Sequence, residues 1–189
     1  ISWAYGGSAG YKEFQYNNEE DRDLTPDEIN AKWAEDKLNE FASSDNEQPF
    51  FLAVGFLRPH TPLIAPQKYF DMYPIEDIQL ANILENDKDD TFRNYDLNYK
   101  NLLMETEKKG SSPTHQQLTR IWIEMFENLE KSYDDPEEGL KRFTQAYLAC
   151  VSAVDDNIGQ VMNAIDNSRL KDNTIIILVS DHGLSLIHI

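Results

Sequence analysis

One stretch near the end of the chain decides the fold: Thr174-Ile175-Ile176-Ile177-Leu178-Val179-Ser180-Asp181-His182-Gly183. Its apolar residues follow one another almost without alternation, which is typical of a strand buried on both faces of a parallel sheet. Ligands of open α/β sheets bind just beyond the carboxyl ends of the strands. Asp181 and His182 are therefore candidate metal ligands at such an edge. The alternative is that Asp181 caps a following helix and His182 is a surface residue.

A second apolar run, Phe50–Phe56, predicts another buried strand, and it too ends in a polar cluster. The cluster reads Leu57-Arg58-Pro59-His60-Thr61-Pro62. Two prolines bracket His60, so the backbone there is stiff and non-helical. A rigid loop at the end of a strand suits a side chain that must be positioned accurately. The alternative is that the prolines only end the strand and His60 is solvated.

Helices are predicted between and before these runs. Thr25-Pro26-Asp27-Glu28 combines a cap, a first-turn proline and the glutamate of a capping box, and it predicts a helix over 26–41. A short helix is predicted over 66–73 and another from Thr114, while His115 is a surface residue. The predicted buried face of the first helix consists of Ile29, Trp33, Ala34, Leu38 and Phe41.

A long helix is predicted after Pro136, with one apolar stripe along it. Cys150 lies on or beside this stripe, so we interpret it as a buried apolar residue and not as a nucleophile. Asp155 and Asp156 are predicted to lie on a solvated face. The stripe consists of Leu140, Phe143, Tyr147, Val151, Val154, Ile158, Val161, Met162 and Ile165.

Composition excludes several classes of function. The chain has 189 residues, 40% of them hydrophobic, and a formal net charge of −17, which argues against binding to nucleic-acid phosphates. No apolar run is long enough to span a membrane. The single cysteine excludes an intrachain disulfide. The acidic segment 75–113 gives no functional indication, because its run 85–90 lacks the spacing of a calcium loop.

The last residues, Leu184–Ile189, match the translation of a transposase adaptor used in short-read DNA library preparation. We expect them to be a sequencing artefact and leave them, with His188, out of the fold prediction.

Two separated segments together resemble the sulfatase family, and most closely its iduronate-2-sulfatase-like members. The first is Pro49–Phe56 leading into Arg58-Pro59-His60-Thr61-Pro62. The second is Tyr147–Gly159, which continues through Asp172-Asn173-Thr174 to Ser180-Asp181-His182-Gly183. The resemblance covers Thr25–Pro74 and Phe143–Gly183.

This resemblance implies an α/β fold, namely part of an alkaline-phosphatase-like sandwich with a mostly parallel central sheet flanked by helices. Residues 1–183 would be the central part of one catalytic domain that is truncated at both ends. The implied activity is the hydrolysis of sulfate esters, for example of sulfated glycans. The implied nucleophile is a formylglycine made from the cysteine of a Cys-x-Pro-Ser-Arg motif, and acids from two segments hold Ca²⁺.

The resemblance also implies roles for individual residues. Asp181 and His182 would be the later pair of calcium ligands, and an aspartate offers the hard oxygen that calcium prefers. His60 would contact the sulfate ester and help the leaving oxygen to depart. Arg58 would flank the pocket and recognise sulfate or a sugar carboxylate.

The sequence departs from the family pattern in ways that matter for activity. No Cys-x-Pro-Ser-Arg motif is present, and neither are the earlier calcium-binding acids or the lysine expected after Asp-His-Gly. One aspartate and one histidine cannot complete a calcium shell of about six to eight oxygens. We therefore expect the chain alone to be inactive and its parent to be active.

Two alternatives stay open. One is a hydrolase of phosphate esters or phosphonates from the same superfamily, with a Ser or Thr nucleophile and zinc or manganese. The other is a sulfatase-like binding protein without a nucleophile. By the resemblance, the parent acts in the periplasm, outside the cell or in the lysosome. The sequence does not indicate the sulfated substrate or the oligomeric state.

Overall fold

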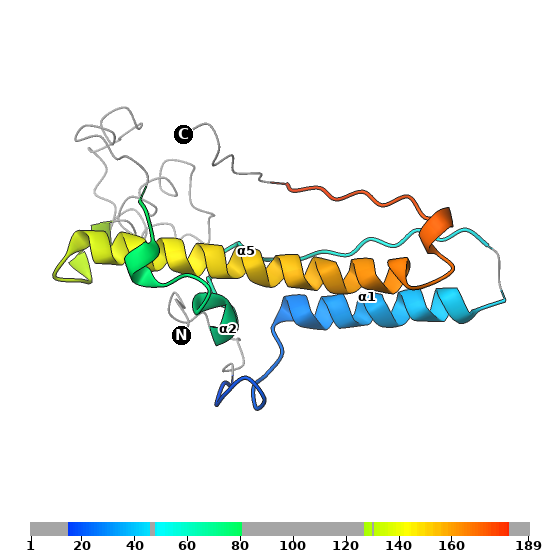
Figure 1. The fold of residues 1–189 in the computed structure, drawn as a ribbon, viewed down its shortest axis with the longest axis horizontal. Helices are drawn as coiled ribbons and strands as arrows, with labels where there is room; N and C mark the ends of the chain where they lie inside the picture. The colour runs from blue at the N-terminus through cyan, green and yellow to red at the C-terminus, as the bar shows by residue number, and fades with distance from the viewer. Residues whose placement is uncertain (1–14, 46–47, 81–126, 130, 182–189) are drawn as a thin grey trace, which may run out of the picture. The chain divides into compact units, whose positions relative to one another are not determined.

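The computed structural model describes residues 15–45, 48–80, 127–129 and 131–181 (Figure 1). Two compact units divide the chain: one joins Ile1–Ile78 to Thr144–Ile189, and the other is Gln79–Phe143. The helices are α1 (Pro26–Ser43), α2 (Gln67–Phe70) and α5 (Pro136–Asp166), with short 3-10 helices η1 (Ile75–Asp77) and η3 (Lys171–Asn173). None of the described helices is both long and apolar enough to cross a bilayer.

Helix α1 begins as its sequence predicts. The Glu28 N–H donates to the Thr25 hydroxyl oxygen at 3.3 Å, and the Thr25 N–H donates to the Glu28 carboxylate at 2.7 Å. This capping box gives partners to N–H groups near the start of the helix. At the other end, the Arg169 guanidinium donates to the carbonyl oxygens of Ala42 and Phe41 at 2.7 and 3.1 Å. The predicted helix 26–41 is confirmed and extends to Ser43.

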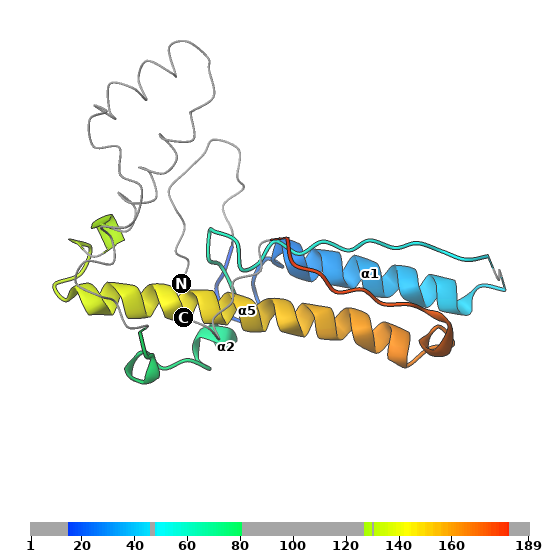
Figure 2. The same cartoon turned by 90° about the horizontal axis from the view of Figure 1, so that it is seen from above.

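Helices α1 and α5 lie side by side and run in the same direction (Figures 1 and 2). Near the middle of the pair, the Gln160 side-chain amide donates to the Glu35 carboxylate at 2.9 Å. Further along, Leu38 of α1 belongs to one apolar cluster with Ala164 and Ile165 of α5. A second cluster joins α5 to the segment around α2 and consists of Leu63, Ala65, Tyr69, Phe70, Ala146, Ala149, Cys150 and Ala153.

The buried faces of both helices differ from the predicted ones. In α1, Ala31, Ala34 and Leu38 are buried, whereas Ile29 and Trp33 are half exposed. In α5, the buried side chains are mostly small, and the predicted residues Phe143 and Val151 are exposed. The reason is that other segments of the same chain pack against the alanine face of each helix, where small side chains permit close packing. The predicted stripes of larger residues are therefore only partly covered in the described part of the chain.

The predicted strand Phe50–Phe56 is extended and runs back along α1, antiparallel to it (Figure 2). The Asn30 side-chain amide donates to the Gly55 carbonyl at 2.9 Å, and the rings of Phe41 and Phe50 lie 4.7 Å apart. Exposure alternates along the segment, as in a β-strand with one covered face. The partly buried residues are Phe50, Leu52, Val54 and Phe56, and the exposed ones are Phe51, Ala53, Gly55 and Leu57.

The predicted strand at the end of the chain is also extended over 174–180 and runs back along α5 (Figures 1 and 2). Its apolar side chains are largely exposed, with 91% of Ile175 and 80% of Val179 accessible. The prediction of burial on both faces is therefore not met in the described residues. Such burial needs neighbouring strands and a second covering layer, and the described residues supply only the helices of one layer.

A paired sheet is absent from the described ranges, where the only isolated bridge is Tyr16–Arg22. The directions are nevertheless those of a parallel α/β arrangement, because α1 and α5 run one way and both extended segments run back the other way. The predicted short helix over 66–73 forms as α2, and the long helix after Pro136 is confirmed as α5. The predicted helix from Thr114, with His115, lies outside the described residues.

In the second unit, the described residues cover the turn before α5 and the start of that helix. Gly139 lies close to helical Leu129, which precedes this turn, and to Tyr133 within it, because a Cβ atom built on it would be 2.9 Å from the Leu129 carbonyl oxygen and 3.0 Å from the Tyr133 ring. A glycine is therefore needed for this close approach of helix and turn.

Candidate functional site

The loop Leu57–Pro62 follows the first extended segment and is held by an aspartate from α1. The Asp27 carboxylate accepts the Leu57 N–H at 2.7 Å with one oxygen and the Arg58 N–H at 2.9 Å with the other. Only 2% of Asp27 is accessible. A buried carboxylate requires such hydrogen bonds, and those to ionised groups are the strong ones. Asp27 therefore ties the loop to the first turn of α1.

The Arg58 side chain forms hydrogen bonds with two backbone carbonyl groups in and just after the loop. Its Nε donates to the Ile64 carbonyl at 3.0 Å and its Nη1 donates to the His60 carbonyl at 2.9 Å. Arg58 is partly buried, and a planar guanidinium that bridges two carbonyl groups fixes their separation. The structure thus brings the predicted site residues Arg58 and His60 together.

His60 is exposed at the tip of this loop. Its backbone N–H donates to the Leu57 carbonyl at 2.9 Å, and its ring Nδ1 lies 2.6 Å from the Thr61 carbonyl oxygen. A carbonyl oxygen only accepts hydrogen bonds, so Nδ1 carries a proton. The Nε2 atom is then an acceptor in the neutral ring and a donor in the imidazolium.

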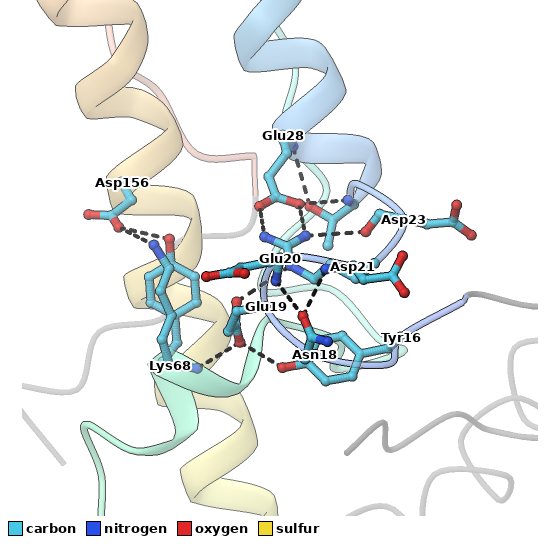
Figure 3. Close-up of polar contacts among 12 residues, drawn as sticks. Tyr16, Asn18, Glu19, Glu20, Asp21, Asp23, Glu28, Lys68 and Asp156 are labelled. Carbon is cyan, nitrogen blue, oxygen red and sulfur yellow. Dashed lines mark hydrogen bonds and ion pairs between the residues drawn. The ribbon is translucent and has the colours of Figure 1, made fainter.

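A network of charged side chains holds the segment that leads into α1. The Arg22 guanidinium donates to both oxygens of Glu28, at 2.6 and 2.8 Å. Burial by itself would raise the pKa of Glu28, but the hydrogen bonds from Arg22 and Thr25 and the Arg22 charge more than offset it, so this pKa is lowered. Figure 3 shows Glu19 between Tyr16 and Lys68, and it accepts the Lys68 N–H at 3.2 Å.

A small cavity lies beside Asp27 and Arg58, with Tyr69, Ala153 and Asn157 also in its lining. It offers about 10 Å³ to the centre of a water molecule, which is room for one water and not for an organic ester.

The predicted metal pair is only half described. Asp181 is exposed at the end of the segment 174–180, and His182 lies outside the described residues. Within the described ranges, no three His, Cys, Asp or Glu side chains gather closely enough to hold a metal ion. The Asp181 carboxylate suits calcium chemically, but it would supply only a small part of the shell.

Cys150 does not fit the formylglycine role, as its sequence context already indicates. It is fully buried in α5, and burial raises the pKa of its thiol to about 11. A buried neutral thiol behaves as a small apolar side chain. The interpretation of Cys150 as a core residue is confirmed.

Comparison with known proteins assigns the chain to a class. The family model described as Sulfatase matches residues 1–188, and the chain belongs to this family, which lies in the alkaline phosphatase superfamily. Membership implies an α/β fold. This supports the fold class predicted from the sequence, although the described residues show no paired sheet.

Individual relatives are similar over most of the chain. A sulfatase of Formosa agariphila is 37% identical over 163 residues, which cover 86% of this chain and 27% of the relative. Iduronate 2-sulfatase of Mus musculus is 33% identical over 146 residues, 73% of this chain and 22% of the relative. Choline-sulfatase of Rhizobium meliloti is 26% identical over 189 residues, 97% of this chain and 31% of the relative. No solved structure matches.

The chain thus spans between about a fifth and a third of the length of these relatives. Sequence reasoning found the loop with Arg58 and His60 but missed the role of Asp27. That residue looked like an ordinary first-turn acid, and nothing in the sequence links it to residues 57 and 58.

Proposed function

We propose that this chain is the central part of a sulfatase that hydrolyses sulfate esters, with His60 at the reacting group. The observation that carries the proposal is the geometry of the loop Leu57–Pro62. It presents the Nε2 edge of an exposed imidazole from a backbone that Asp27 and Arg58 hold. Family membership supplies the class of reaction.

The proposed role of His60 is to donate a proton to the ester oxygen as the sulfur–oxygen bond breaks, so that a neutral alcohol departs. Because Nδ1 already donates to the Thr61 carbonyl, this proton must come from Nε2 of the imidazolium. Arg58 adds positive charge beside the loop, which favours an anionic sulfate group.

We further propose that the remaining parts of the site come from other segments of the complete enzyme. Asp181, with His182, would supply the later ligands of a calcium ion, which stabilises negative charge on the transferring group when it is bound. The nucleophile would be a formylglycine on a cysteine other than Cys150. The two extended segments would join a mostly parallel central sheet flanked by helices, and the chain alone would be inactive.

The substrate class and location are inferred at a coarser level. Relatives named for iduronate and for choline point to different sulfate esters, so we propose a sulfate ester of a glycan or small molecule without choosing the sugar. The proposed location of the complete protein is the periplasm, the exterior or the lysosome. Residues 184–189 are proposed to be an adaptor-derived artefact.

The first test is to read the source DNA across both ends of the chain and express the complete protein with its cysteine-modifying enzyme. We expect it to hydrolyse a sulfate monoester, and His60→Ala to lower kcat/KM by about 10² to 10⁴, the usual contribution of a general acid. A preference for the matching phosphate ester would instead support the phosphohydrolase alternative. A reading frame without any nucleophile would favour a binding protein.

A further inference from the structure

The Asp27 carboxylate is the anchor of the proposed site. Two facts set it apart from the other first-turn acid, Glu28. It is 2% accessible, and the donors of both hydrogen bonds that it accepts are backbone N–H groups about thirty residues later in the chain. Glu28, by contrast, is bound to Arg22 and Thr25 close by in the sequence.

The two residues that Asp27 holds are those that hold His60. The Leu57 carbonyl accepts the His60 N–H at 2.9 Å, and the Arg58 Nη1 donates to the His60 carbonyl at 2.9 Å. The His60 N–H and the His60 carbonyl are therefore each hydrogen-bonded to a residue, Leu57 or Arg58, whose own backbone N–H donates to Asp27.

Asp27 itself is rigidly mounted. It lies in the first turn of α1, between the two capping-box residues Thr25 and Glu28, and the same face of the helix buries Ala31 and Ala34. A carboxylate has two acceptor oxygens, so it can accept hydrogen bonds from two consecutive N–H groups at once. An amide or a hydroxyl in its place offers only one acceptor oxygen at that position.

We propose that Asp27 is the positioning residue of the active site: it acts through Leu57 and Arg58 to fix the direction in which His60 presents Nε2. This inference rests on the proposed general-acid role of His60. Asp27 does not touch the substrate, and its contribution is geometric. A misplacement of about 1 Å at a reacting group can cost about a hundredfold in rate.

The test uses the complete enzyme and two substrates that differ in their need for an acid. An alkyl sulfate has a poor leaving group and depends on proton donation, whereas 4-nitrophenyl sulfate has a good one and depends on it little. The readout is the ratio of kcat/KM for the alkyl ester to that for the nitrophenyl ester. A loss of folded protein lowers both values equally and leaves this ratio unchanged.

We expect Asp27→Asn to lower kcat/KM for the alkyl sulfate by about a hundredfold and for the nitrophenyl ester by less than about tenfold, as for a displaced acid. His60→Ala should lower the ratio at least as much. The matched control is Thr25→Ala, which weakens the cap of the same helix without touching the loop, and it should leave the ratio unchanged. Asp27→Ser, which keeps one acceptor oxygen, replaces Asp27→Asn if that variant does not fold.

Each outcome has a separate meaning. An unchanged ratio in the Asp27 variant, together with a lowered ratio in His60→Ala, would overturn the positioning role alone. An unchanged ratio in His60→Ala would overturn the general-acid role and this inference with it. A lowered ratio in Thr25→Ala would also overturn the inference, because any weakening of α1 would then suffice.

Discussion

Cys150 shows at the scale of one residue how surroundings decide chemistry. The thiol lies in the interface of α5 with the segment around α2, where it is fully buried and its pKa is raised to about 11. Only the thiolate is an effective nucleophile. The only cysteine of the chain is thus expected to be unreactive as a nucleophile in the folded protein.

This leads to an expected outcome for alkylation at pH 8. Against an ordinary thiol with a pKa of about 8.5, the thiolate fraction of Cys150 is lower by roughly two orders of magnitude, and burial slows the reaction further. Iodoacetamide should label the peptide containing Cys150 in urea but not in the native complete protein. Mass spectrometry of the digested protein reads this directly, and rapid labelling of the native protein would contradict the buried position.

At the scale of the element, the start of α1 combines stability and site geometry within four residues. Thr25 and Glu28 cap the helix, Asp27 holds the loop Leu57–Pro62, and the Arg22 guanidinium from the preceding segment pairs with Glu28. The helix needs its cap to form, and the loop needs the helix to be in place. One helical turn therefore carries both the local capping residues and the long-range contact of Asp27 with the loop.

The lowered pKa of Glu28 gives this turn a defined pH dependence. Because the folded pKa lies below the value of 4.5 expected for a free glutamate, the ionised carboxylate stabilises the fold above about pH 4.5. That contribution is lost as the pH falls through the folded pKa. Glu28→Gln should therefore lower stability at pH 7 and flatten its decline below about pH 4.5.

Urea unfolding of the complete protein at several pH values measures this effect. The matched control is Glu40→Gln, at the exposed end of the same helix, whose surface ion pair with Lys37 at 2.7 Å should contribute little. An equally steep acid transition in Glu28→Gln and in the unmodified protein would argue against the Arg22–Glu28 pair as its source.

At the scale of the whole molecule, the described residues form one helical layer and two extended segments with uncovered apolar faces. Phe51 is 93% accessible and Ile175 is 91% accessible. Apolar surface of this kind is normally covered in a soluble protein. The relatives are about three to five times as long as the matched region, which is enough chain to supply further strands and a second layer.

We expect the backbone N–H groups of 50–56 and 175–179 to be protected from hydrogen exchange in the complete protein. Protection follows because N–H groups within a sheet are hydrogen-bonded and exchange only when the structure opens. Exchange followed by mass spectrometry tests this, with peptides from α5 as the protected reference. Complete exchange of both segments within seconds would contradict the proposed sheet.

Several features were determined by the sequence alone. The capping box set the start of α1, helical periodicity gave α1 and α5, and the prolines around His60 marked a rigid loop. These succeed because caps, periodicity and proline act over a few residues. The motif Arg58-Pro59-His60 together with the later Ser180-Asp181-His182-Gly183 indicated the family that the comparisons confirm.

Only the tertiary structure decided which helix faces are buried and what holds His60. Periodicity selects the stripe of large apolar residues, but close packing of α1 and α5 selected their alanine faces instead. Asp27 could not be recognised from the sequence, because its partners Leu57 and Arg58 lie about thirty residues away. Long-range contacts depend on how all segments pack together, and a local sequence pattern does not indicate which distant residues will contact it.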